Sequence, residues 1–320
     1  MWKRIELHNH TIESDGCMTV RELVSFLSSK GISAFSLTDH NTISGWEQLA
    51  EAAREIHGNP EFIYGYELTS YFGHMLCQNV FSYIPWDDID EGNADLLFQR
   101  VHDMGGLAGP AHTFSIPFPF STGMRWSMKI HDFRLVDFIE IINNAHPMTP
   151  DNKNAVLWWE KLIFEGFPIA PTAGLDLHRP QLPQNAFTTF LNIPDGAAAL
   201  PLKDQLNQAV KSLNTCVTRG PIADWREENG CLTVFLEPGT DSYCPTGDLI
   251  NSPVPEAPET TGYLCQLRTA EKHWTRPLDH GVCSFPLSNL PASVRSAVIL
   301  VFQGRADWDH LIAAARPFFR

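Results

Sequence analysis

The sequence predicts an α/β fold with a parallel sheet, followed by a smaller β-rich part. Through residue 215, short apolar runs alternate with amphipathic helical patterns, which is the order of repeated β–α units. Seven or eight predicted strands favour a closed barrel over an open sheet. After residue 216, apolar runs follow one another between turns rich in proline and glycine, as in antiparallel β structure. The expected domains are therefore 1–215 and 216–320.

The first part begins with a strand at residues 4–10. Thr19 and Glu22 form a capping box that starts a helix, which ends at Gly31. Ser44 and Glu47 repeat this pattern before a second helix. The further strands expected here cover residues 34–38, 62–67, 74–81, 107–111, 137–142, 168–172 and 187–193, and the further helices cover 94–104, 152–164 and 202–213.

The second part is predicted as a β-sandwich-like domain with a terminal helix. Apolar runs predict strands at 232–236, 263–267, 282–287 and 297–302. Residues 306–316 are predicted to form the closing helix. Residues 251–262 contain three prolines and are expected to be a flexible connector or loop.

Composition excludes several classes of protein. The chain has 320 residues, with 23 Lys and Arg against 37 Asp and Glu, a formal charge of −14. Such a chain does not offer nucleic acid or anionic lipid an extended surface, although one nucleotide in a metal-bearing pocket stays possible. We find no membrane span and no signal peptide. The seven cysteines form no C-x-x-C pair and are expected to be reduced thiols in a cytoplasmic protein.

Histidines and carboxylates gather where the predicted strands end. His8 and His10 lie two residues apart on one strand, so both point to the same face. Asp176 and His178 repeat that spacing. In a β/α barrel, the carboxyl ends of the strands meet at one site. The candidate metal ligands at these ends are His8, His10, Asp15, His40, Glu67, His74, His112, Asp176 and His178.

A single histidine at a strand end is usually an ordinary hydrogen-bonded residue. That explanation suits the histidines in predicted helices, loops and the β part: His57, His102, His131, His273, His280 and His310. The joint pattern is different, because six imidazoles and three carboxylates cannot be buried together without a compensating cation. Nitrogen and oxygen ligands without sulfur indicate Zn, Mn or Fe.

These motifs resemble the PHP family, the metal-dependent phosphoesterase domain also found in bacterial replicative polymerases and histidinol phosphatases. The motifs appear in the family's order and span residues 1 to about 215. They are His8-Asn9-His10 with Asp15, Thr38-Asp39-His40, Glu67, Gly73-His74-Met75-Leu76, His112 and Asp176-Leu177-His178. Residues 138–143, Trp158 and residues 216–221 are similar to the carbaryl-hydrolase-like branch of the family.

The resemblance implies a distorted (β/α)7 TIM-like barrel with two or three divalent ions. It assigns one ion to His8, His10, Glu67 and Asp176. It assigns a second ion to Glu67, His74 and His112, and a third to Asp15, His40 and His178. Where many relatives have His-Pro, this chain has His112-Thr113, followed by an aromatic loop at residues 114–120. This departure leaves the substrate open.

The function expected from the resemblance is phosphoester hydrolysis by a hydroxide that bridges two ions. The substrate would be a small phosphomonoester, a cyclic phosphate or a nucleotide. Glu67, Asp176 and His178 are candidate catalytic residues through the ions. Arg179 is a candidate phosphate contact and Arg125 has the same status, although an ordinary exposed arginine is the better explanation of each. His146, past a strand end, is one candidate leaving-group acid and a metal-bound water is another.

Two other functions stay open. The same ions could hydrolyse a carbamate, ester or amide, with the aromatic loop and Trp126 around an apolar pocket. Alternatively, the chain could be a metal-stabilised binding module, which the full ligand set disfavours. The β-rich part is left with three roles: a structural one, a contact in a homo-oligomer, or a cover over the mouth of the site.

Overall fold

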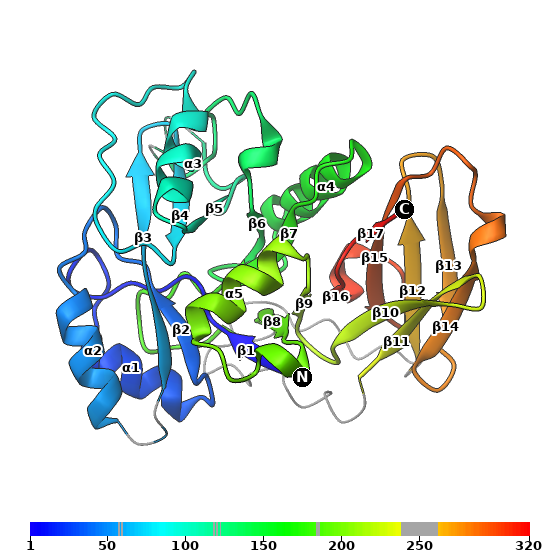
Figure 1. The fold of residues 1–320 in the computed structure, drawn as a ribbon, viewed down its shortest axis with the longest axis horizontal. Helices are drawn as coiled ribbons and strands as arrows, with labels where there is room; N and C mark the ends of the chain where they lie inside the picture. Colours follow the sequence, from blue (N-terminus) through cyan, green and yellow to red (C-terminus); the bar gives the residue numbers. More distant parts are fainter. Residues whose placement is uncertain are drawn as a thin grey trace.

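The structure of the chain is a computed structural model that describes residues 1–56, 58, 60–117, 119, 121, 123–183, 186–237 and 262–320. Strands and helices alternate through α5, and strands follow one another from β9 onwards (Figure 1). The mixed α/β fold is thus confirmed. The predicted connector at 251–262 lies outside the described residues, except for Gly262. Cys244 also lies outside them. The six described cysteines are free thiols.

The first part contains most of the elements expected from the sequence. Its strands are β1 (Trp2–Ile5), β2 (Ala34–Leu37), β3 (Glu61–Ser70), β4 (Gly73–Gln78), β5 (Leu107–Pro110), β6 (Phe138–Asn143), β7 (Ala170–Gly174) and β8 (Thr188–Asn192). Its helices are α1 (Val20–Ser29), α2 (Trp46–Glu55), α3 (Ala94–Asp103), α4 (Pro150–Phe164) and α5 (Leu202–Lys211), with single 3-10 turns at η1 (Phe133–Leu135) and η2 (Asp195–Ala197).

One of the two predicted capping boxes is present. Thr19 accepts a hydrogen bond from the Glu22 amide, and the Glu22 carboxylate accepts one from the Thr19 amide, which fixes the start of α1. The second prediction is wrong, because α2 starts at Trp46 without a side-chain cap. The Ser44 hydroxyl donates to the carboxylate of Glu13 instead, at 2.5 Å.

The expected parallel sheet is only partly present. β2 pairs with β3, and β6 with β7, in parallel, whereas β4 runs antiparallel to both β3 and β5. The reason is the two-residue connection between Ser70 and Gly73, which is too short for the crossover that parallel strands need. Strand pairing among the described residues gives four separate sheets and no closed barrel.

Side chains join sheets where strand pairing stops. Asp137 accepts from the amide of Ala108 at 2.8 Å, which links β5 to β6. Thr189 exchanges hydrogen bonds with the backbone of Ala173 and links β7 to β8. A parallel bridge between Glu6 and Phe35 continues the contact from β1 to β2. These contacts hold the ends of several strands around one point.

The second part is all-β among its described residues, apart from the single turns η4 (Leu287–Asn289) and η5 (Trp308–His310). Its strands are β9 (Thr215–Thr218), β10 (Ala223–Glu228), β11 (Cys231–Leu236), β12 (Tyr263–Arg268), β13 (His273–Pro277), β14 (Val282–Pro286), β15 (Ser296–Gln303), β16 (Leu311–Ala314) and β17 (Phe318–Phe319). One large sheet, in the order β1-β8-β9-β16-β15-β12-β13, includes strands from both parts of the chain.

The predicted closing helix at 306–316 is wrong. This segment holds the short turn η5 and the strand β16, which pairs with β15 and β9. All four residues of β16 are buried, so its sequence is continuously apolar. Periodicity cannot distinguish such a strand from part of a buried helix.

β15 is buried on both faces and gives the two parts a common core. Ile299 and Val301 pack with the residues of the β-rich part. Leu300 and Phe302, which alternate with them, belong to the cluster that contains Trp159 of α4. α4 therefore lies between the α/β strands and β15 (Figure 1).

Candidate metal centre

The structure brings all nine predicted ligands to one place. His8 and His10 follow β1, His40 follows β2, and Asp176 and His178 follow β7. Two ligands do not sit at the carboxyl end of a strand: Glu67 lies inside β3, and His74 lies at the start of β4. The β3–β4 hairpin, with Thr69 opposite His74, turns both side chains to the same cluster.

Glu67 is at the centre of the cluster and is fully buried. Its Oε1 lies 2.9 Å from His74 Nδ1 and 2.9 Å from His112 Nε2. Its Oε2 lies 3.0 Å from His8 Nε2, 3.3 Å from His10 Nε2 and 3.2 Å from His40 Nδ1. One carboxylate thus contacts imidazoles from the ends of β1, β2 and β5 and from β4.

The two aspartates complete the cluster, and Asp176 faces the same ring nitrogens of His8 and His10 as Glu67 does. Asp176 Oδ1 is 3.1 Å from His10 Nε2 and 3.4 Å from His8 Nε2. Asp15 Oδ1 is 3.1 Å from His178 Nε2, and its Oδ2 is 3.6 Å from His40 Nε2. His10, between the aspartates, stacks on the rings of His40 and His178.

Three groups of ligand atoms are close enough to hold an ion. They are His8, His10, Glu67 and Asp176; His10, Asp15, His40 and His178; and His40, Glu67 and His74. The first group has the members predicted for one ion, and the second contains those predicted for another. In the third group His40 stands where His112 was expected, while His112 contacts the same Glu67 oxygen from outside the group.

These residues fit divalent metal ions. Nδ1 of His10 and Nε2 of His74 are buried and make no hydrogen bond within the described part of the chain, whereas Nε2 of His10 has the carboxylates of Asp176 and Glu67 at 3.1 and 3.3 Å. Buried polar atoms of this kind are rare unless they have a partner such as an ion. The donors are imidazole nitrogens and carboxylate oxygens without sulfur, the set that suits Zn, Mn or Fe.

The pKa shifts of His10 and Glu67 also fit a site for divalent metal ions. Burial alone would lower the pKa of His10, but the carboxylates of Asp176 and Glu67 outweigh it and raise that pKa to about 9. Burial would raise the pKa of Glu67, but His8 and His74 hold it well below its usual range. Without a metal, the buried carboxylates are therefore balanced by protons on the histidines, and cations would replace those protons.

Glu140 supports the cluster and was not predicted as a site residue. Its Oε1 lies 2.8 Å from His8 Nδ1, and its Oε2 accepts from the amide of His112 at 2.8 Å. A carboxylate bonded to the far nitrogen of a metal-ligating histidine fixes its tautomer and orientation. The signal in the sequence is a glutamate inside the apolar run 138–142, which predicts a buried carboxylate needing partners.

Gly174, at the end of β7, allows Glu140 to reach His8. A Cβ at this position would collide with Glu140 Oε1 and would lie 2.5 Å from His8 Cβ. Next to it, Asp176 has a φ of +51°, and His112 has a φ of +28°. Backbone strain of this kind costs ~1–3 kcal/mol per residue and gathers at functional sites.

A cavity of about 210 Å³ opens beside the cluster. Its lining includes the candidate ligands His112 and Asp176 and the apolar residues Phe114, Ile116 and Met124. It also includes polar residues of β6, α4 and the loop between them: Asn143, His146, Thr149, Asp151 and Asn152. No lysine or arginine lines the described part of this cavity.

The remaining predicted substrate contacts are placed differently. His146 lines the cavity. The guanidinium of Arg125 instead donates to the carbonyls of Ser115 and Phe114, at 3.0 and 3.3 Å. Arg179 is exposed and is not part of the cavity wall. The predicted aromatic loop is described only in part, since residues 118 and 120 lie outside the described residues.

Comparison with known proteins finds a family match over the part of the chain that holds seven of the nine candidate ligands. Residues 6–114 match the family model of the PHP domain. The prediction of a PHP domain is thereby confirmed, while the carbaryl-hydrolase-like branch stays a prediction. Among the described residues, none of the helices has both the length and the apolar character that a membrane span requires.

Two further comparisons find similar proteins. A 5'-3' exoribonuclease of Haemophilus influenzae is 36% identical over 70 residues, which is 22% of this chain and 25% of that protein. The match spans only about a quarter of that relative. A two-domain protein of Bacteroides vulgatus, described as containing a predicted PHP-like metal-dependent phosphoesterase, has a TM-score of 0.56 at 12% identity. That similarity covers 99% of this chain and 95% of the other, and shows a shared fold.

Proposed function

We propose that this chain is a metal-dependent hydrolase that cleaves a phosphoester of a small molecule. The observation that carries the proposal is the position of Glu67, whose two oxygens contact five histidines in a buried cluster next to an open cavity. Bound divalent ions would supply Lewis acidity and a water of lowered pKa at this place.

The proposed ligands are the nine residues of the cluster. We assign His8, His10, Glu67 and Asp176 to one ion, and Asp15, His40 and His178 to a second. Glu67 and His74, with His112 or His40, would hold a third. Glu140 orients His8, and Asn143 donates to Asp176 Oδ2 at 3.1 Å, so both keep ligands in place before substrate arrives.

In this proposal the leaving group would lie in the cavity near Phe114, Ile116 and His146. His146 is the side chain we propose to give the leaving oxygen its proton, because it lines the same cavity as the candidate ligands His112 and Asp176. Since no described lysine or arginine lines this wall, the bound ions would neutralise the phosphate. Arg179 and Arg125 are therefore secondary candidates at most.

The lining of the same cavity also favours a second reaction. A cavity with an apolar wall and no described cation also suits a neutral carbamate, ester or amide. Inorganic phosphate should compete with a phosphoester but not with the binding of a neutral carbamate.

The architecture that we propose for this domain is a distorted barrel, interrupted where β1 meets β2, where β5 meets β6 and where β7 meets β8. The bridge between Glu6 and Phe35 and the side-chain bonds of Asp137 and Thr189 across these three gaps support it. Residues 1–215 would form the hydrolase domain and residues 216–320 the β domain, despite the sheet that they share.

The test is metal analysis paired with turnover. We expect two or three ions of Zn, Mn or Fe per chain, and metal-dependent release of p-nitrophenol from p-nitrophenyl phosphate or its bis ester. The variant His8→Ala/His10→Ala should lose both, and His273→Ala, an exposed histidine of β13, should lose neither. Less than one ion per chain after reconstitution would contradict the proposal, and cleavage of a p-nitrophenyl carbamate alone would favour the second reaction.

A further inference from the structure

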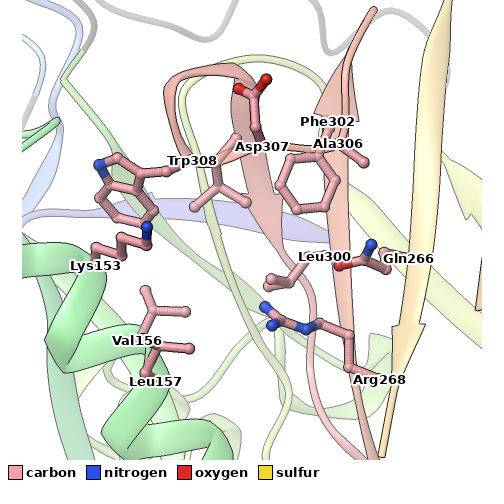
Figure 2. Close-up of a pocket in the computed structure, with 11 residues that line it drawn as sticks. Lys153, Val156, Leu157, Gln266, Arg268, Leu300, Phe302, Ala306, Asp307 and Trp308 are labelled. Carbon is pink, nitrogen blue, oxygen red and sulfur yellow. The ribbon is translucent and has the colours of Figure 1, made fainter. Parts of the chain in front are cut away.

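A second cavity, of about 240 Å³, lies against α4 (Figure 2), and it is lined by other α4 residues than the cavity beside the metal cluster. Val156 and Leu157 of α4 face the side chains of β12 and β15 across it. The segment that carries Trp308 closes one end. None of the predicted metal ligands lines this cavity, so it is separate from the proposed active site.

The walls of the second cavity are apolar and rigid. Leu300 and Phe302 of β15 are buried members of the central core. The indole of Trp308 is held by a hydrogen bond of 2.9 Å from its Nε1 to the carbonyl of Met148. Fixed aromatic and aliphatic side chains of this kind suit a flat apolar molecule. The volume is below that of most drug-sized pockets, which fits a molecule of one or two rings.

Two cations reach the same space. Figure 2 shows the side chain of Lys153 extending from α4 into the cavity and the guanidinium of Arg268 extending toward α4. Lys153 makes no ion pair within the described part of the chain. Arg268 Nη1 is 2.7 Å from Glu160 Oε1, but Arg268 Nε is buried without a hydrogen-bond partner among the described residues. A chain with a net charge of −14 thus directs two cations into one apolar cavity.

The acids near these cations leave them incompletely balanced. Burial raises the pKa of Glu160 to about 7 despite the opposing effect of Arg268, so this carboxyl is partly protonated at neutral pH. Asp307, the acid in the cavity wall, is already paired with His310 and with Arg305 Nε at 3.3 Å.

We propose that the second cavity binds a small aromatic carboxylate, with its ring between α4 and β15 and its carboxylate on Lys153 and Arg268. The planar guanidinium fits a carboxylate, and the lysine adds an unpaired charge at the mouth. The ring replaces water against Leu300, Phe302 and Trp308. This inference does not depend on the proposed reaction, because it uses no metal ligand.

The test is calorimetric titration of the purified protein with 2-naphthoate. We expect binding of 2-naphthoate in the micromolar to millimolar range, and at least tenfold weaker binding of 2-naphthamide and of acetate. Lys153→Met should weaken binding about fivefold or more, whereas Lys203→Met, an exposed lysine on α5, should not.

Two further variants locate the site. Ala306→Trp, at an exposed position of the cavity wall, should fill the space and abolish binding. His10→Ala should leave binding unchanged, because a carboxylate bound at the metal centre would depend on that residue. Absence of binding at millimolar 2-naphthoate, equal binding of the amide, or loss of binding in His10→Ala but not in Ala306→Trp would each overturn the proposal.

Discussion

Ionisable groups are buried on two sides of α4, and the two sites balance their charges in different ways. In the metal cluster, six histidines and three carboxylates approach one another, with Glu67 in contact with five rings. On the other side, Glu160 has one charged partner, Arg268, at 2.7 Å. Apolar residues in place of the cluster would remove the candidate metal site. Apolar residues of similar size can often replace an isolated buried ion pair without loss of stability.

Backbone geometry reinforces this difference. Asp176 and His112 hold strained φ values beside the cluster, and Gly174 is the residue type that leaves room for Glu140 and His8. The pair on α4 and β12 sits on regular helix and strand backbone. The comparison teaches that burial of charge alone does not mark a metal centre. Strain and crowding around the charges do.

The largest expected effect comes from the centre of the cluster. Glu67→Gln keeps the shape but removes the negative charge that five histidines share, so ion binding should fail. We expect loss of at least one ion per chain and a fall in turnover of ~10³-fold, about 4 kcal/mol. Metal analysis and initial rates measure this. The exposed Glu47→Gln on α2 serves as control, and retention of all ions by Glu67→Gln would contradict the arrangement.

The next largest effect is expected from steric overlap at Gly174 rather than from a change of charge. Gly174→Ala places a methyl group against Glu140 and His8, so β7 or the glutamate must move. We expect a loss of ~1–3 kcal/mol in unfolding free energy together with weaker metal binding. Denaturant unfolding with and without added Mn checks both. Gly196→Ala, whose Cβ would meet nothing within 4 Å, should change neither.

A smaller effect is expected from the support of His8. Glu140→Gln keeps the size of the side chain but weakens its hold on His8 Nδ1. Metal affinity or activity should fall by ~10–100-fold, as is typical when the partner of a ligating histidine is changed. Competition with a chelator measures the affinity. If Glu140→Gln behaved like the wild type, the assigned support of His8 would be wrong.

The smallest effect is expected on the other side of α4. Replacing both members of the pair, Glu160→Met with Arg268→Met, should change unfolding free energy by ~1 kcal/mol or less near pH 7. Arg268→Met alone should cost more, because Glu160 is left buried without its partner. If the double and the single variant were equally destabilised, this pair could not be replaced by apolar residues, and its contrast with the cluster would be wrong.

The pair of Glu160 and Arg268 also makes the free energy of unfolding depend on pH. The pKa of Glu160 is raised from 4.5 to about 7 by burial, so its contribution to stability is fully present below pH 4.5 and is lost as the pH rises through 7. Over that window, the wild type should lose up to ~1.4 kcal/mol of stability per pH unit relative to the double variant. Urea unfolding of both proteins at pH 5, 6, 7 and 8 measures the difference.

The sequence predicted the members of the cluster better than the residues that support them. His8, Asp176 and most other members could be predicted because residue types and strand-end positions are local features. Glu140 lies inside β6, and its partners His8 and His112 come from other strands. Such a contact depends on how strands are placed in space, which spacing along one chain does not encode.

The errors in the predicted fold have the same origin. β4 follows β3 by a two-residue turn, so Glu67 and His74 meet across an antiparallel hairpin instead of at successive parallel strand ends. β16 lies inside the large sheet, and its burial on both faces removed the alternation that marks a strand. The capping box of Thr19 and Glu22 was predictable because its atoms lie within one turn.

α4 has a consequence for how this protein can change over generations. Asn152 and Ala155 face the cavity beside the metal cluster, and Lys153 and Val156, one residue further on in each case, face the other cavity. Because the helix moves as a rigid rod, a substitution that shifts it alters the size of both cavities at once. Selection on either cavity therefore constrains the other, and substitutions on the two faces of α4 should covary among related sequences.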